Sequence, residues 1–106
     1  MQTIVLKFYV SEKQHHQGEL LYEWLLRLAQ RLELPGGSAF RAIAGFGKHG
    51  RLHEETFFEL AGELAVAVEF IILDAQRADQ LLAAITEEKL KLHYVRYAVE
   101  AGTTGA

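Results

Sequence analysis

The spacing of hydrophobic residues changes several times along this chain, and the order of those spacings constrains the fold more than any other feature. Residues 3–10 are rich in β-branched and aromatic residues, and a strand there places Ile4, Leu6, Phe8 and Val10 on one face. From Glu19 the spacing becomes that of an amphipathic helix. The apolar stripe of this helix consists of Leu21, Trp24, Leu25, Leu28 and Leu32. The sequence Leu34-Pro35-Gly36-Gly37 ends the helix, because proline and glycine favour a turn.

The second half of the chain repeats these patterns. Residues 38–46 are predicted to form a second strand, and residues 64–73, the most apolar run, a central strand. Asp74 is the predicted N-cap of a second helix. Residues 92–99 are predicted to form the last strand.

This order, β-α-β-β-α-β, is that of an α+β domain with the ferredoxin-like, or split-βαβ, plan. Two right-handed crossovers place both helices on one face of a four-stranded antiparallel sheet. The 106 residues suffice for one such domain, which we assign to residues 1–100. Residues 101–106 are small and polar, and we expect a disordered tail there.

The face of the sheet away from the helices is predicted to be apolar. It is expected to carry Val5, Lys7 and Tyr9 from the first strand and Ala65, Ala67, Glu69 and Ile71 from the third, joined by Arg41 and Ile43 from the second. Such a face favours self-association, with Val5, Ile43, Ala67 and Ile71 at the interface and Lys7, Arg41 and Glu69 pairing across it. The alternative is an open sheet that stays in water.

Composition excludes several classes of function. The net charge of -3 argues against nucleic-acid binding, which needs a basic surface. The absence of cysteine excludes disulfides, thiolate zinc sites and cysteine nucleophiles. No apolar run approaches the roughly 20 residues that span a bilayer, and no signal peptide is recognisable. We therefore expect a cytoplasmic domain that does not insert into membranes.

Catalytic and metal-binding patterns are weak in this sequence. No serine lies in a nucleophile elbow, so we expect a protein that is not an enzyme. His15 and His16 are adjacent and should point apart. His49 and His53 have the spacing of two ligands on a helix, but Gly50 argues against a helix there. Divalent-cation binding between the loops of neighbouring subunits remains the alternative function.

The segment Gly45–Arg51, with the sequence GFGKHGR, is the strongest candidate for a binding site. Backbone amides that no side chain covers form nests for phosphate, and Lys48 and Arg51 supply positive charge. The segment is not a Walker loop, since no Gly-Lys-Ser/Thr opens a helix. The alternative is a plain connection with solvated cations. Arg41 is either an ion-pair partner on the sheet or a phosphate ligand, and both remain open.

Three patterns in the chain resemble those of the PII-like proteins grouped as domain of unknown function 190 (DUF190). The patterns are Gly18 with Leu21 and Tyr22; Arg41 with Gly45, Phe46 and Gly47, followed by Arg51 and His53; and the apolar stretch 64–68 followed by Glu69. The chain departs from the family at three positions. It has Leu20 and Ala65 where proline is usual, and Ala42 where glycine is frequent.

The resemblance implies a homotrimer of ferredoxin-like subunits whose sheets line the inside. Adenine nucleotides are expected in the clefts between subunits, and no other cofactor. The residues implied in nucleotide binding are Arg41, Gly45, Phe46, Gly47, Lys48, Arg51 and His53. The resemblance also implies a regulatory role, in which nucleotide contacts order the stretch from Lys48 to Glu55 and so change the surface offered to a target protein, such as a membrane transporter.

Overall fold

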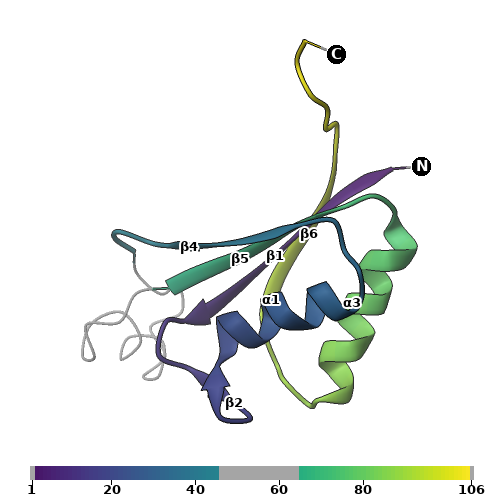
Figure 1. Ribbon diagram of the computed structural model, residues 1–106. Coiled ribbons are helices and arrows are strands. Elements are labelled where there is room, and N and C mark those ends of the chain that lie inside the picture. Colours follow the sequence, from purple (N-terminus) through teal and green to yellow (C-terminus); the bar gives the residue numbers. More distant parts are fainter. Residues whose placement is uncertain (1, 46–64, 106) are drawn as a thin grey trace.

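The computed structural model describes residues 2–45 and 65–105 and shows a four-stranded sheet covered on one side by two helices (Figure 1). The elements are β1 (Thr3–Ser11), β2 (His15–His16), β3 (Glu19–Leu20), α1 (Leu21–Arg31), β4 (Gly37–Arg41), β5 (Ala65–Ile72), α3 (Ala75–Glu87) and β6 (His93–Val99). The strand order is β4-β5-β1-β6, and every neighbouring pair is antiparallel. The predicted α+β, ferredoxin-like and PII-like fold is confirmed.

Two elements differ from the sequence prediction. The polar stretch after β1 contains a small hairpin, in which β2 pairs with β3 across Gln17 and Gly18. Both turn residues have positive φ, 52° and 82°, as the two-residue turn of a tight hairpin requires. Strands of two residues show no periodicity, so the sequence pattern did not reveal them. β4 begins at Gly37 and ends at Arg41, and is therefore shorter than the predicted strand at residues 38–46.

The core lies between the helix-facing side of the sheet and the two helices. It is formed by alternate residues of β1 and β5 and by the predicted stripe of α1. Its largest fully buried side chains are Leu6, Phe8, Leu21, Leu25, Val68, Phe70, Ile72 and Leu81. Phe8 and Phe70 meet edge to face, with ring centroids 6.2 Å apart, which is a favourable aromatic geometry.

Gly37 lies where the ring of Phe70 leaves no room for a side chain. A Cβ at this position would be 2.5 Å from Cε1 of Phe70, whereas a Cβ at Gly36 would meet nothing within 4 Å. We expect Gly37→Ala to lower the free energy of unfolding by about 1–3 kcal/mol, because Phe70 is fully buried and must shift. Gly36→Ala is the matched control and should change it little. Urea denaturation of both variants tests this, and equal stabilities would contradict it.

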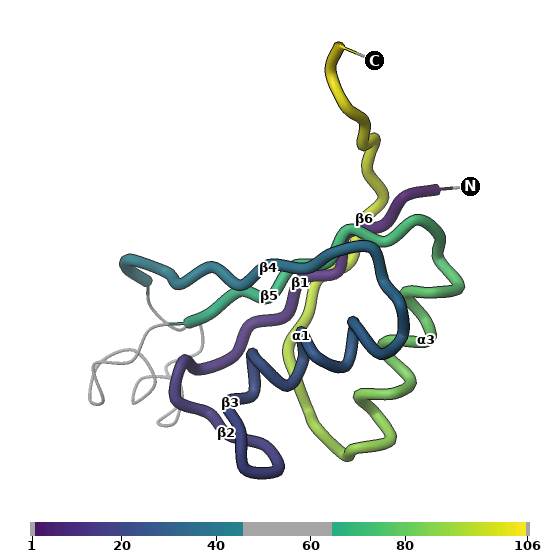
Figure 2. The backbone as a smooth tube through the Cα atoms, in the orientation of Figure 1, coloured from purple at the N-terminus to yellow at the C-terminus, as the bar shows by residue number. Residues whose placement is uncertain are grey.

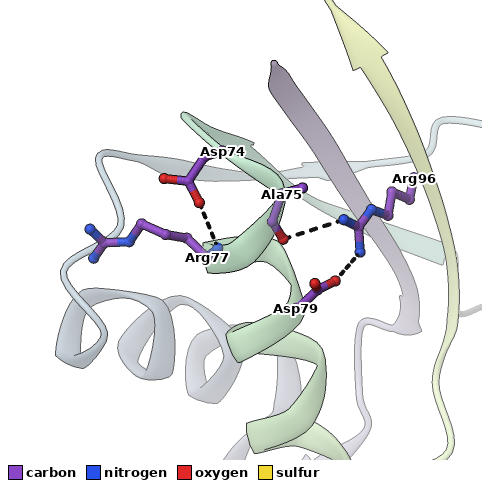
Figure 3. A network of polar contacts seen from close by, with 5 residues as sticks. All are labelled: Asp74, Ala75, Arg77, Asp79 and Arg96. Carbon is purple, nitrogen blue, oxygen red and sulfur yellow. Dashed lines mark hydrogen bonds and ion pairs between the residues drawn. The ribbon is translucent and has the colours of Figure 1, made fainter. Parts of the chain in front are cut away.

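Two residues hold the start of α3, and one of them, Arg77, also reaches the end of α1. Asp74, the predicted N-cap, accepts a hydrogen bond from the backbone N–H of Arg77 at 2.9 Å (Figure 3). The guanidinium of Arg77 donates to the carbonyl oxygens of Leu32 and Glu33 at 2.7 and 3.1 Å. These carbonyls lie just past α1, where a positive charge also complements the helix dipole. Arg77 therefore joins the end of α1 to the start of α3.

A second arginine joins α3 to the edge strand β6. Arg96 donates from Nη1 to the carboxylate of Asp79 at 2.7 Å and from Nη2 to the carbonyl oxygen of Ala75 at 3.3 Å (Figure 3). Arg96 lies opposite Leu6 in the ladder, on the helix-facing side of the sheet. This contact ties the helix to the strand in the part of the sheet where α3 packs.

The other face of the sheet has no helix over it, and we call it the open face. By the strand register and its alternation, it carries Val5, Lys7, Tyr9, Phe40, Ala67, Glu69, Ile71, Val95 and Tyr97. Four of its large apolar or aromatic side chains are exposed to solvent, namely Tyr9, Phe40, Ile71 and Tyr97. In the described strands, the formal charges on this face are Lys7 and Glu69, which lie opposite each other with Nζ and Oε2 3.6 Å apart. The predicted apolar character of this face is confirmed.

Two residues expected on the open face lie elsewhere. Arg41 pairs with Val66, whose side chain is buried on the helix-facing side, so Arg41 belongs to that side as well. Ile43 follows the end of β4 and is 96% exposed, so it is not part of the sheet. Arg41 was misplaced because its neighbours on its own face, Gly37 and Ala39, are too small to mark a buried side in the sequence. Ile43 was misplaced because β4 ends before it, at Arg41.

No helix in the described ranges is long and apolar enough to cross a membrane. After β6 the chain leaves the sheet, and residues 101–105 are exposed and form no helix or strand (Figure 2).

Candidate functional site

The candidate site lies at the end of the sheet where β4 ends and β5 begins. Arg41 of β4 pairs with Val66 of β5, which in turn pairs with Val10 of β1, so three strands meet in one row. Just beyond this row, the backbone N–H of Ala42 donates to the carbonyl oxygen of Ala65 at 2.8 Å. The chain thus leaves β4 and enters β5 at adjacent points, and we call this place the base of the β4–β5 connection.

Arg41 forms an ion pair at this base with a residue that follows β1. Its Nε lies 2.8 Å from Oε1 of Glu12, across the beginning of β5. The side chain of Arg41 is 66% exposed, whereas that of Glu12 is only 18% exposed. The ion-pair interpretation of Arg41 is therefore confirmed, although its partner lies on the helix-facing side rather than across the open face. A role as phosphate ligand stays a prediction.

Glu12 is a residue that sequence reasoning missed. It follows the last residue of β1, and the alternation of that strand places position 12 on the same side as Val10. The position of Glu12 points to Arg41 only once the strand register is known, because the register places Val10 of β1 and Arg41 of β4 on either side of Val66. Because that register joins segments far apart in the sequence, no local pattern contained it.

The other residues predicted for nucleotide binding fall into two groups. Gly45 lies four residues past Arg41 and is exposed. Phe46, Gly47, Lys48, Arg51 and His53 lie outside the described residues. A hollow of about 630 Å³ lies between α1 and the start of β4, lined among others by Leu26, Leu34 and Phe70. It is at the opposite end of β4 from Arg41, so the two are separate features.

The two adjacent histidines of β2 take different partners. Nδ1 of His15 lies 2.8 Å from the carbonyl oxygen of Lys13. His16 packs edge-on against Trp24 with ring centroids 4.7 Å apart, and its Nε2 lies 3.1 Å from Oε1 of Glu88 at the end of α3. The two imidazole rings therefore contact different residues. In residues 2–45 and 65–105, no three His, Asp or Glu side chains are grouped as metal ligands.

Glu88 connects the hairpin to α3, because the same oxygen also accepts a hydrogen bond from Nε2 of Gln17 at 2.8 Å. We expect Glu88→Ala to lower the free energy of unfolding by about 0.5–1.5 kcal/mol, the usual value of a partly exposed hydrogen bond. Trp24 is the one tryptophan of the sequence, so its fluorescence in a urea titration reports on this region. The neighbouring, exposed Glu87 provides the control variant Glu87→Ala. Identical midpoints for the two variants would contradict the expected role of Glu88.

The sheet with two helices on one face and an apolar open face defines a small PII-like domain. Residues 3–103 match the model of the DUF190 family, described as Uncharacterized ACR, and the chain belongs to this family.

Two curated relatives carry the name UPF0166 protein. The chain is 37% identical over 67 residues to the protein of Aquifex aeolicus (strain VF5), a match that covers 63% of the chain and 64% of the relative. It is 29% identical over 70 residues to the UPF0166 protein MJ1524 of Methanocaldococcus jannaschii, covering 66% of the chain and 64% of the relative. The matched parts thus span slightly less than two thirds of either relative.

Proposed function

We propose that this protein is a PII-like regulatory protein, not an enzyme, that binds an adenine nucleotide in the clefts between the subunits of a homotrimer. Occupancy of the site would change the surface that the β4–β5 connection offers to a partner protein, such as a membrane transporter. The proposal gives the exposed arginine at the base of this connection the role of a phosphate ligand.

The position and exposure of Arg41 carry the nucleotide part of the proposal. A guanidinium presents five N–H donors in a planar fork that matches the oxygens of a phosphate. The 2.8 Å contact with Glu12 engages Nε, and the side chain is 66% exposed. A ligand can therefore approach Arg41 from the solvent. The glycine-rich sequence that begins at Gly45 supports the proposal because such sequences supply backbone donors for phosphate.

The open face supports the trimeric part of the proposal. Exposed aromatic and aliphatic side chains on a continuous sheet surface favour burial against another protein surface. The Lys7–Glu69 pair does not prevent this, because the two charges are already opposite each other within one subunit. A covering subunit would then bury a pair of opposite charges. Burying an isolated charge would cost far more free energy.

Calorimetric titration of the purified protein with ATP, ADP and AMP tests the proposed function. We expect saturable binding of at least one of these nucleotides and a higher melting temperature in its presence. The affinity should fall as salt is added, because part of the attraction to phosphate is screened. No heat and no shift in melting temperature at millimolar nucleotide would overturn the proposal. A parallel titration with zinc tests the alternative of a divalent-cation-binding trimer.

A further inference from the structure

We infer that the Glu12 carboxylate competes with a phosphate group for the guanidinium of Arg41 and so lowers the affinity of the site for nucleotide. The inference rests on the proposed function, and it adds a residue that regulates the affinity of the same site. It makes Glu12 an internal competitor of the ligand.

The geometry of the pair is that of an occupied anion site. Nε of Arg41 and Oε1 of Glu12 are 2.8 Å apart, which is a close ion pair. A carboxylate and a phosphate both offer negatively charged oxygens to a guanidinium. Glu12 is therefore chemically a substitute for the phosphate that the proposed function assigns to Arg41.

The two partners differ in how far the protein shields them. The side chain of Glu12 is 18% exposed, and that of Arg41 is 66% exposed. The carboxylate thus lies on the inner side of the pair, and the guanidinium lies toward solvent. A phosphate that arrives from the solvent reaches Arg41 first, and its oxygens then compete with Oε1 of Glu12 for the same N–H donors.

The backbone around Glu12 is fixed, so the competition concerns a side chain. The turn after β1 is closed by a hydrogen bond from the N–H of Gln14 to the carbonyl oxygen of Ser11 at 3.1 Å. The carbonyl oxygen of Gln14 accepts in turn from the N–H of Leu21, at the start of α1, at 2.7 Å. Because the turn is joined to the helix, the competition is expected to move the Glu12 side chain rather than the backbone. The like charges of carboxylate and phosphate favour that displacement over a shared site.

The test is a double-mutant cycle in which ATP is titrated into four proteins. These are the natural protein, Glu12→Gln, Arg41→Ala and the double variant. Glutamine keeps the shape of Glu12 and removes its charge, so Glu12→Gln should bind ATP about tenfold more tightly. In the Arg41→Ala background the same change should give no gain, because the competition requires the guanidinium.

Glu19→Gln is the matched control. Glu19 also pairs with an arginine, Arg27, at 2.9 Å, and its replacement changes the net charge by the same amount away from the site. It should leave ATP affinity unchanged. Melting curves establish that each variant is folded. If Glu12→Gln does not fold, Glu12→Asp replaces it, because a side chain shorter by one methylene retracts the carboxylate and should give a smaller gain in the same direction.

The outcomes separate this inference from the proposed function. If the natural protein binds ATP and Glu12→Gln binds equally or less tightly, the inference is wrong and the proposed function stands. A gain that persists without Arg41, or that Glu19→Gln reproduces, also overturns the inference. If none of the proteins binds a nucleotide, both the inference and the proposed function fail.

Discussion

Replacing Ala67 by aspartate is expected to dissociate the proposed homotrimer or to prevent folding of its subunits. Ala67 lies on the open face between Tyr9 of β1 and Phe40 of β4, its direct neighbours in the sheet. A subunit packed over this face would bury the new carboxylate without a partner, at a cost of several kcal/mol. Light scattering at micromolar concentration should give the mass of three chains for the natural protein and a smaller mass for the variant.

Ala98→Asp is the control for this experiment. Ala98 lies in β6 opposite Ile4, on the helix-facing side of the sheet, and is exposed. The same new charge on this side should leave the mass unchanged. A natural protein with the mass of a single chain would contradict the proposed trimer, and so would a trimeric Ala67→Asp variant.

Replacing Arg41 by alanine is expected to weaken nucleotide binding about ten- to a hundredfold. The change removes a charge-assisted contact to phosphate, worth about 1.5–3 kcal/mol, and removes the positive charge that lies 2.8 Å from the Glu12 carboxylate. Arg27→Ala is the control, because Arg27 is similarly exposed and also forms an ion pair with a glutamate. Calorimetry should show the loss for Arg41→Ala alone. Equal affinities for the two variants would exclude Arg41 as a phosphate ligand.

The sequence predicted the order of the main strands and helices because their signals are local. The alternation in β1 and the run of β5 identified the buried and open faces, and both assignments agree with the register. The partner of Arg27 in α1 was not predicted from the sequence. Glu23 has the favourable spacing to Arg27 on the helix, but Arg27 pairs with Glu19, which precedes the helix. The spacing rule considers positions within a helix and overlooks a partner in the strand before it.

The edge strand and the site show where sequence reasoning failed. The helix-facing side of β4 contains Gly37 and Ala39, whereas the larger Phe40 faces away. With such a pattern, alternation places Arg41 on the wrong side. The pairing of Arg41 with Glu12 depends on β5 lying between β4 and β1, and this neighbour relation follows from the assembled sheet alone. Arg41 was thus predicted as a candidate phosphate-binding residue, but its side of the sheet and its ion pair with Glu12 were not predicted.

Native mass spectrometry of the purified protein with ATP tests the central claim most directly, because one spectrum reports both assembly and ligand. We expect a species of three chains, each of 11.9 kDa, carrying up to one nucleotide per subunit. The nucleotide-bearing species should be absent or much reduced for Arg41→Ala. A single chain without nucleotide, at ATP concentrations up to the millimolar range, would contradict the account.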